Sequence, residues 1–178
     1  IEKRRAIGIK LKGGQEVTGK VIISNIDVHA TFSALLGEDQ IPSGFRSKLK
    51  GMKPSLSYFI LYLGIDGGLE ELSVPNNEVF PDDQLSKEYG ALYENRIPDR
   101  APFYLLAPSN VNPSHAPEGK STLCLSMKAP YHFSRDWDQK VIDQLSQHLI
   151  SRASVLVPDL NKRILTKAEA TPKTIEKW

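Results

Sequence analysis

Residues 108–120 constrain the fold of this chain more than any other segment. The segment reads PSNVNPSHAPEGK, with turn-forming residues at Pro108, Pro113, Pro117 and Gly119. Apolar runs flank it at 103–107 and 122–127. Because proline fixes φ and lacks an N–H group, the segment cannot continue the ladder of either neighbouring strand. The pattern therefore predicts a long, rigid loop that joins two strands, at 102–107 and 121–129.

The beginning of the chain predicts a β-hairpin. Residues with high β-propensity occupy 6–11 and 17–24, and the second run ends in Val-Ile-Ile-Ser. Between them, Gly13 and Gly14 can adopt the positive φ that a tight turn needs. We expect two antiparallel strands here.

Helices are predicted at 30–36, 82–93 and 137–156, the last two from apolar residues at helical spacing, and a short helix with loops is predicted within 40–53. Asp27 could cap the first helix and Gly37 would end it. Asp136, followed three residues later by Gln139, resembles a capping box for the last helix, and Pro158 would stop that helix.

Two more strands are predicted, at 55–64 and 162–168. The first is rich in aromatic residues and too apolar for a strand with one solvated face, so we expect both of its faces to be covered. Thr171 then forms an N-cap with Pro172 at the first helical position, which predicts a final helix.

Composition excludes several classes of protein. Hydrophobic residues make up 40% of the 178 residues, which suffices for a folded core, and a net charge of +2 gives no case for nucleic-acid binding. Cys124 is the one cysteine, so no disulfide forms within the chain. The four histidines are scattered, which predicts no metal site. The longest apolar stretch, 56–65, is far shorter than the roughly 20 residues that a membrane-spanning helix needs.

Motifs of several enzyme classes are absent from the sequence. A dinucleotide site needs a G-x-G-x-x-G turn between a strand and a helix, and no such turn occurs. Neither a P-loop nor a G-x-S-x-G nucleophile elbow is present. Cys124 lies in an apolar alternation typical of a core residue, without a neighbouring base. We assign no catalytic residue.

The loop and the hairpin both resemble a known family. The loop is similar to the "PS..DPS.APEGK" segment of the phytoene desaturase and retinol saturase family of FAD-dependent oxidoreductases. Residues 6–25 resemble the hairpin "V-x-G-V-x-L-x-x-G-x-x-I-x-A-D-x-V-I-S-N" of amine-oxidase-type flavoproteins, except that Gly19 and Lys20 replace the usual Ala-Asp pair. Residues 55–64 and 171–178 match further family patterns, so the resemblance covers essentially the whole chain.

The resemblance implies a fold and a division into domains. The fold would be α+β, with a mixed, largely antiparallel sheet flanked by helices, as in the substrate-binding domain of those flavoproteins. Residues 1–28 would be a remnant hairpin of the FAD-binding domain, 29–170 the substrate-binding domain, and 171–178 the start of the helix that returns to the FAD domain. The chain would thus be a portion of a longer enzyme, inactive by itself.

The resemblance also implies cofactor, partners and location. FAD would be bound by the complete protein and not by this portion. The partners would be an apolar polyene or lipid substrate, the missing FAD-binding domain and a membrane surface, for a cytoplasmic or peripheral membrane protein. Desaturation, saturation and isomerisation of the substrate stay open. A rival hypothesis is a stand-alone binding module for an apolar ligand or a partner protein.

Candidate site residues follow from the same resemblance. The walls of a substrate tunnel would be Tyr58, Phe59, Tyr62, Phe103 and Tyr104; the alternative is that they are plain core residues. Since side chains alternate along a strand, Tyr58 and Tyr62 share one face and Phe59 points to the other.

Four polar residues complete the set of candidates. Asn25 and Asp27 would approach the flavin, with helix capping as the alternative for this strand end. His115 and Lys120 stand in the conspicuous loop and are expected to be exposed polar residues.

Overall fold

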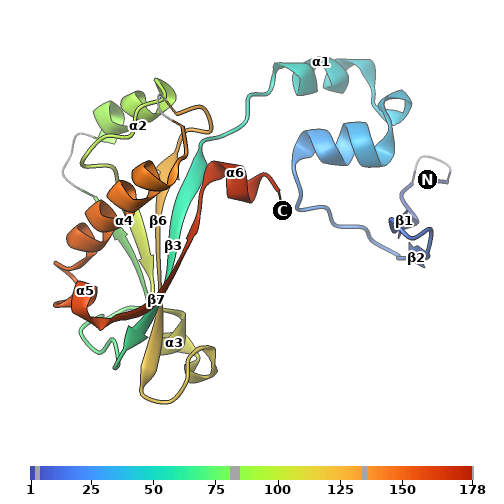
Figure 1. Cartoon of the computed structure of the whole chain (residues 1–178). Helices are drawn as coiled ribbons and strands as arrows, with labels where there is room; N and C mark the ends of the chain where they lie inside the picture. Colours follow the sequence, from blue (N-terminus) through green and yellow to red (C-terminus); the bar gives the residue numbers. More distant parts are fainter. Residues whose placement is uncertain (3–4, 81–84, 134–135, 178) are drawn as a thin grey trace. The chain divides into compact units, whose positions relative to one another are not determined.

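The structure is a computed structural model that describes residues 1–2, 5–80, 85–133 and 136–177. The chain forms two compact units, Ile1–Pro54 and Ser55–Trp178 (Figure 1). Each unit has its own secondary structure and its own buried residues, so each is described by itself. The predicted assignment of 1–28, 29–170 and 171–178 to flavin and substrate domains concerns larger proteins and stays a prediction.

The first unit begins with the predicted hairpin. Strands β1 (Gly8–Lys10) and β2 (Glu16–Thr18) pair antiparallel, and Gly14 adopts a φ of 86° in the turn. The return strand ends at Thr18 instead of continuing to residue 24. Val21 and Ile23 are 75% and 88% exposed, because no strand or core in the described part of the chain covers them.

Helical segments form the rest of this unit. They are the π-helix η1 (Ala30–Leu36), the 3₁₀ turn η2 (Glu38–Gln40) and the α-helix α1 (Ser43–Gly51). Gly37, with a φ of 89°, ends η1 as predicted. The rings of Phe32 and Phe45 lie 4.7 Å apart and hold η1 against α1, and Ile41 and Leu49 are buried in this unit.

A five-stranded sheet organises the second unit. Its strands are β3 (Ser57–Asp66), β4 (Asn76–Val79), β5 (Phe103–Leu106), β6 (Lys120–Ala129) and β7 (Ile164–Ala170). They lie in the order β4-β5-β6-β3-β7, and each described pair is antiparallel. The predicted α+β class is confirmed. Strand β4 was not predicted, because its sequence, NNEV, lacks the apolar alternation of the other strands.

Helices complete the unit: α2 (Leu85–Tyr93), α3 (Pro108–Val111), the 3₁₀ turn η3 (Pro113–His115), α4 (Gln139–Ala153), α5 (Leu160–Arg163) and α6 (Pro172–Ile175). Helix α4 packs across one face of the sheet (Figure 1). Its Leu149, Ile150 and Ala153 join the sheet residues Phe59 and Leu125 in a single buried core. None of the helices in the described ranges is long and apolar enough to span a bilayer.

The strand predicted at 55–64 buries only one face. On β3, Phe59, Leu61, Leu63 and Ile65 are buried, whereas Tyr62 on the other side is 50% exposed. The expectation that both faces would be covered is therefore wrong for this chain. The physical reason is that α4 supplies one apolar layer, and a sheet with antiparallel neighbours can leave its second face open.

Residues 108–120 form the predicted rigid loop between β5 and β6. Two short helical turns, α3 and η3, fill it, and the Asn112 side-chain oxygen accepts a hydrogen bond from the Ser114 N–H group at 3.1 Å. Gly119 adopts a φ of 68° just before β6. Such a conformation favours glycine, which explains the Gly in this turn.

The caps of two helices test the sequence interpretation. Asp138, not Asp136, caps α4: its Oδ1 accepts a hydrogen bond from the Val141 N–H group at 2.8 Å. The capping box predicted for Asp136 is wrong, because the helix begins two residues later than expected. The cap predicted at Thr171 is confirmed, with Pro172 at the first helical position of α6.

Replacing Asp138 with Ala should lower the free energy of unfolding by about 1 kcal/mol, because the Val141 N–H group loses its acceptor. Urea denaturation followed by circular dichroism measures the change. Asp136→Ala is the matched control and should stay within about 0.5 kcal/mol of the parent protein. Equal effects of the two substitutions would contradict the cap assignment.

Phe59 and Tyr62 provide a test of which face of the sheet is the core. Phe59→Ala should cost roughly 3–5 kcal/mol of stability, because it leaves a cavity in the core. Tyr62→Ala should cost about 1 kcal/mol or less, because half of this side chain already contacts solvent. A larger loss of stability for Tyr62→Ala in the same denaturation experiment would show that the face opposite α4 is covered.

Candidate functional site

The face of the sheet opposite α4 carries the candidate site. We call it the open face, and its central residues are Tyr58, Ile60, Tyr62, Tyr104, Leu106, Cys124, Ser126 and Lys128. The register brings them together: Tyr62 lies opposite Cys124, and Ser126 lies between Ile60 on β3 and Tyr104 on β5. Residues from three strands thus make one continuous surface.

Small side chains run through the middle of the open face. Ser126 and Cys124 on β6 are followed across β3 by Ala168 and Ala170 on β7. Gly64 belongs to the same face, and a Cβ atom there would lie 2.6 Å from Cγ2 of Thr166. These short side chains lie between the larger tyrosine, leucine and isoleucine side chains, and Ser126 among them is buried.

One end of the open face is a tyrosine cluster. The Tyr104 hydroxyl donates a hydrogen bond to Glu78 on β4, and this bond, followed by burial, raises the pKa of Tyr104 to about 12. The phenol therefore stays protonated at neutral pH. The Lys128 ammonium lies 4.8 Å from the centre of the Tyr89 ring, and Tyr58 lies directly opposite Lys128 in the sheet.

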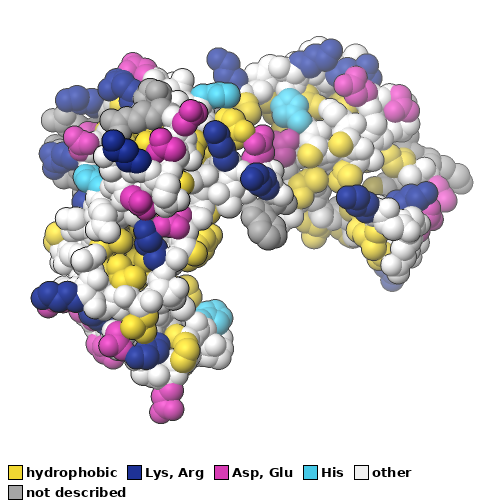
Figure 2. Space-filling view, in the orientation of Figure 1, with side chains coloured by type: hydrophobic (Ala, Val, Ile, Leu, Met, Phe, Trp, Pro, Cys, Tyr) yellow, Lys and Arg dark blue, Asp and Glu magenta, His cyan; other side chains and the backbone are white. Residues whose placement is uncertain are grey.

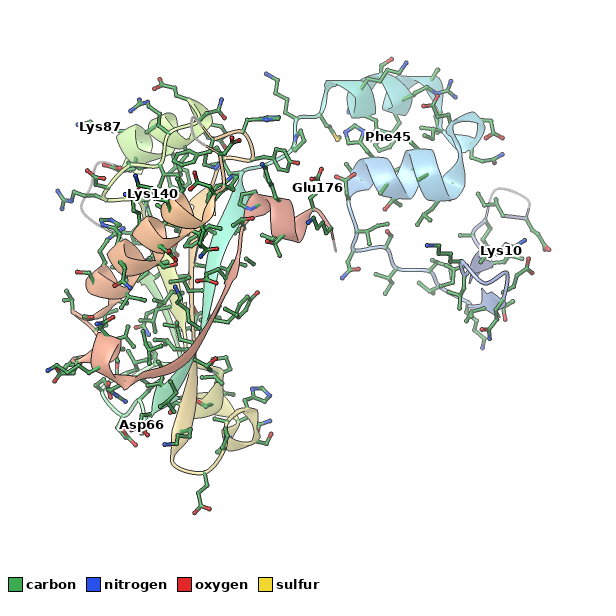
Figure 3. The ribbon with its side chains drawn as sticks, viewed as in Figure 1. Lys10, Phe45, Asp66, Lys87, Lys140 and Glu176 are labelled. Carbon is green, nitrogen blue, oxygen red and sulfur yellow. The ribbon has the colours of Figure 1, made fainter. Side chains whose placement is uncertain are left out.

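The other end of the open face closes with an ion pair. Lys120, the first residue of β6, pairs with Asp66, the last residue of β3 (labelled in Figure 3). The hydrogen bond and the charge of Lys120 hold the pKa of Asp66 below its ordinary value. Lys120 is thus neutralised by a partner, whereas His115 of the same loop is exposed as predicted.

The structure separates the predicted aromatic residues by face. Tyr58, Tyr62 and Tyr104 lie on the open face, whereas Phe59 and Phe103 are fully buried on the opposite face. The Arg152 guanidinium covers the Phe103 ring at 4.8 Å. A ligand on the open face can therefore reach the tyrosines but neither phenylalanine.

Sequence reasoning missed five of the eight central residues of this surface. Ile60, Cys124 and Lys128 became part of it only through the pairing of β3 with β6, and Leu106 and Ser126 joined it through the pairing of β5 with β6. The alternation of apolar residues along each strand could have assigned their face. The partner strand and the register, which join them to Tyr58 and Tyr104, are not visible in the local pattern.

Asn25 and Asp27 lie in the first unit, and both are exposed. The Asp27 side chain accepts a hydrogen bond from the Ala30 N–H group at 3.0 Å, so its carboxylate serves as a cap at the start of the helical segment. In the described residues, no strand leads through a glycine-rich turn into a helix, the arrangement that holds a dinucleotide pyrophosphate.

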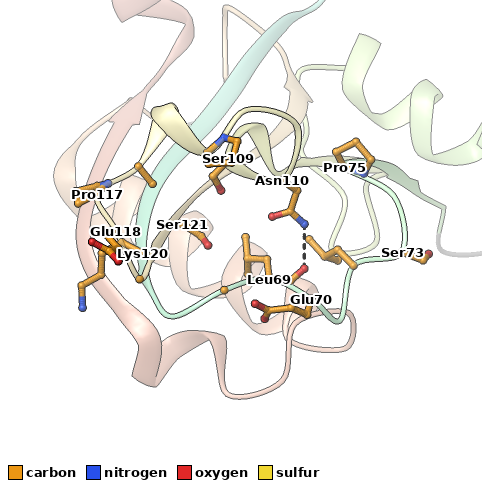
Figure 4. A pocket seen from close by; sticks show the side chains of 15 residues that line it. Leu69, Glu70, Ser73, Pro75, Ser109, Asn110, Pro117, Glu118, Lys120 and Ser121 are labelled. Atoms are coloured by element: carbon orange, nitrogen blue, oxygen red, sulfur yellow. Dashed lines mark hydrogen bonds between the residues drawn. The ribbon is translucent and has the colours of Figure 1, made fainter.

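A separate cavity of about 680 Å³ lies between the loop at 108–120 and the segment after β3 (Figure 4). The Asn110 side chain donates to the Leu69 carbonyl oxygen at 3.0 Å, and Ser121 donates to the Gly67 carbonyl oxygen at 2.9 Å. Glu70 and Glu118 also line the cavity. These bonds tie the two loops together, which gives the predicted rigid loop a structural role.

The chemistry available on the open face is that of binding. Burial raises the pKa of the Cys124 thiol, which disfavours the thiolate that a nucleophile needs. On the visible face in Figure 2, Lys and Arg side chains are interspersed with Asp and Glu among the described residues. The open face itself combines the apolar side chains of Ile60, Tyr62 and Leu106 with polar groups at both ends.

No family model matches the chain. Curated proteins do: the zeta-carotene-forming phytoene desaturase of Myxococcus xanthus is 28% identical over 175 residues, which is 98% of this chain and 32% of that protein. The 4,4'-diapolycopene oxygenase of Methylomonas sp is 26% identical, over 97% of this chain and 34% of that protein. The inactive all-trans-retinol 13,14-reductase of Danio rerio is 25% identical, over 96% of this chain and 32% of that protein.

Among solved structures, the crystal structure of the PF1083 protein from Pyrococcus furiosus is similar in fold. The TM-score is 0.52 at 17% sequence identity, over 93% of this chain and 34% of that chain. This chain thus spans about a third of the length of the proteins it matches. It is a distant homologue, over nearly its whole length, of phytoene desaturases, carotenoid oxygenases and retinol reductases.

Proposed function

We propose that this chain is the substrate-binding portion of a larger FAD-dependent oxidoreductase that acts on a polyene or another apolar lipid. The open face is the observation that carries the proposal. The distant homologues are named for carotenoid and retinol chemistry, and the chain corresponds to about a third of each. Substrate, reaction and partners of the larger protein are part of the proposal.

The composition of the open face supports an apolar ligand. Leu106, Ile60 and Tyr62 offer apolar contact around the short side chains of Cys124 and Ser126. A ligand that covers this surface removes apolar area from water, which favours binding by roughly 25 cal/mol per Å². A flat polyene suits a sheet surface, because it needs little depth to make contact along its length.

The redox chemistry would belong to FAD, bound by another part of the larger protein. In the proposal, the remaining two thirds of the larger protein bind FAD, and this chain orients the substrate. Tyr58, Tyr62 and Tyr104 are the proposed substrate contacts. The reaction stays open between desaturation, saturation and isomerisation.

A stand-alone binding module remains the second candidate function. The observation that favours it is the core of the second unit, which is complete around α4 and includes fully buried Phe59, Phe103 and Leu125. A unit with its own core can fold and bind a ligand without a catalytic partner. Both candidates use the open face, and they differ in whether a flavin domain joins it.

Binding of diphenylhexatriene, an apolar polyene that fluoresces when it leaves water, tests the proposed surface. The chain should bind this probe, and Tyr62→Asp should weaken binding about tenfold or more, because a charge enters the apolar middle of the face. Val155→Asp is the matched control, since Val155 is 84% exposed in the turn that follows α4. Its affinity should equal that of the parent protein. Equal fluorescence titrations for both variants would remove the open face as the binding surface.

Incubation with excess FAD followed by desalting tests where the flavin binds. The purified chain should return without visible flavin absorption, because it lacks a dinucleotide-binding turn. The matched control is the full-length phytoene desaturase of Myxococcus xanthus, which should remain yellow if the proposal holds for the family. Flavin retained by this chain alone would contradict the proposal that another part of the larger protein binds FAD.

A further inference from the structure

Lys128 is the unusual residue of the open face. It lies near the end of β6, directly opposite Tyr58, and its side chain is half-buried. Its ammonium group sits 4.8 Å from the centre of the Tyr89 ring. An ammonium held against an aromatic ring loses part of its hydration, so it gains more from an anionic partner than a fully solvated lysine does.

The other lysines of the sheet have carboxylate partners. Lys120 pairs with Asp66, and Lys167 pairs with Glu169 at 2.7 Å. In the ranges that the structure describes, no carboxylate forms an ion pair with Lys128. Glu78, on the same face, already accepts the hydrogen bond of Tyr104. Lys128 therefore has no salt-bridge partner within the described chain.

Charge complementarity then points to one kind of ligand. We propose that the open face binds an apolar chain that ends in a carboxylate, with the carboxylate against Lys128 and the chain running past Ile60 and Tyr62. Tyr58 and Tyr89 lie next to Lys128 at this polar end of the face. The apolar part of the inference rests on the proposed function, whereas the carboxylate part rests on Lys128 alone.

The dimensions of the face agree with such a ligand. Lys128 lies eight residue steps along β6 from Lys120, roughly 27 Å at about 3.4 Å per step. Lys120 is neutralised by Asp66, so only the Lys128 end attracts an anion. A chain shorter than this span would lie on the face in one direction, with its charged end at the tyrosine cluster.

The test uses cis-parinaric acid, a fluorescent polyene fatty acid, and its uncharged methyl ester, titrated at neutral pH into the full 178-residue chain. The parent protein should bind the acid about tenfold more tightly than the ester, as expected for one charge-assisted contact. Lys128→Met should reduce the ratio of acid affinity to ester affinity from about ten to about one. Lys128→Arg should restore most of it.

Lys140→Met is the matched control, because Lys140 is exposed on α4, which covers the opposite face of the sheet (labelled in Figure 3). It should retain the full preference for the acid. Urea denaturation of each variant checks that the fold is intact. If Lys128→Met does not fold, the acid-to-ester affinity ratios of the parent protein and of Lys128→Arg decide whether the carboxylate binds at Lys128.

Other results overturn the inference in distinguishable ways. Equal binding of acid and ester by the parent protein would refute the carboxylate partner and leave the proposed apolar surface standing. Equal losses for acid and ester in Lys128→Met would show that Lys128 only supports the face through its packing on Tyr89. Failure of the parent protein to bind either probe would reject both the inference and the proposed function.

Discussion

The antiparallel pairing of β3 with β6 is the interaction on which the rest of the second unit depends. It runs from Ser57 opposite Ala129 to Asp66 opposite Lys120, the full length of both ten-residue strands. These two strands hold the centre of the sheet, and β5 and β7 add to their outer edges. Because a shift of one residue would turn every side chain to the other face, this register defines the core and the open face together.

The buried face of the sheet stabilises the second unit, and it also fixes which side chains lie on the open face. Fully buried Phe59, Leu61 and Leu125 each contribute roughly 1.5–3 kcal/mol through removal of apolar surface from water. Their orientation toward α4 requires Tyr58 and Tyr62 to point away from it. The candidate binding surface is thus a geometric consequence of the core, and substitutions on it should disturb binding more than stability.

Polar contacts hold the loops at the end of the sheet. Arg163 at the end of α5 donates from Nε to the Asp66 carbonyl oxygen at 3.1 Å and pairs with Glu71 at 2.6 Å. The Asn110 side-chain amide donates to the Leu69 carbonyl oxygen. The loop at 108–120, which carries the resemblance to the flavoprotein family, therefore braces the segment after β3 and lies at the end of the open face that Asp66 and Lys120 close.

The sequence by itself determined most of the elements and the parity of their side chains. Proline and glycine in the loop, apolar spacing in α4 and the Thr171 cap are local signals, and the local backbone obeys them. The sequence also separated Phe59 from Tyr58 and Tyr62. The sequence did not predict β4, because its polar residues carry little periodic signal. It also gave the wrong cap for α4, because Asp136 and Asp138 are both suitable N-cap residues close in sequence.

Only the tertiary structure decided which surface these residues share. Strand order and register bring Lys128 beside Tyr58, and Ser126 between Ile60 and Tyr104, although long stretches of chain separate them. It also decided that one face of β3 stays open, because coverage depends on what packs from elsewhere in the chain. Long-range strand pairing depends on the apolar surface that many residues, far apart in the chain, bury together. A local sequence pattern does not contain that information.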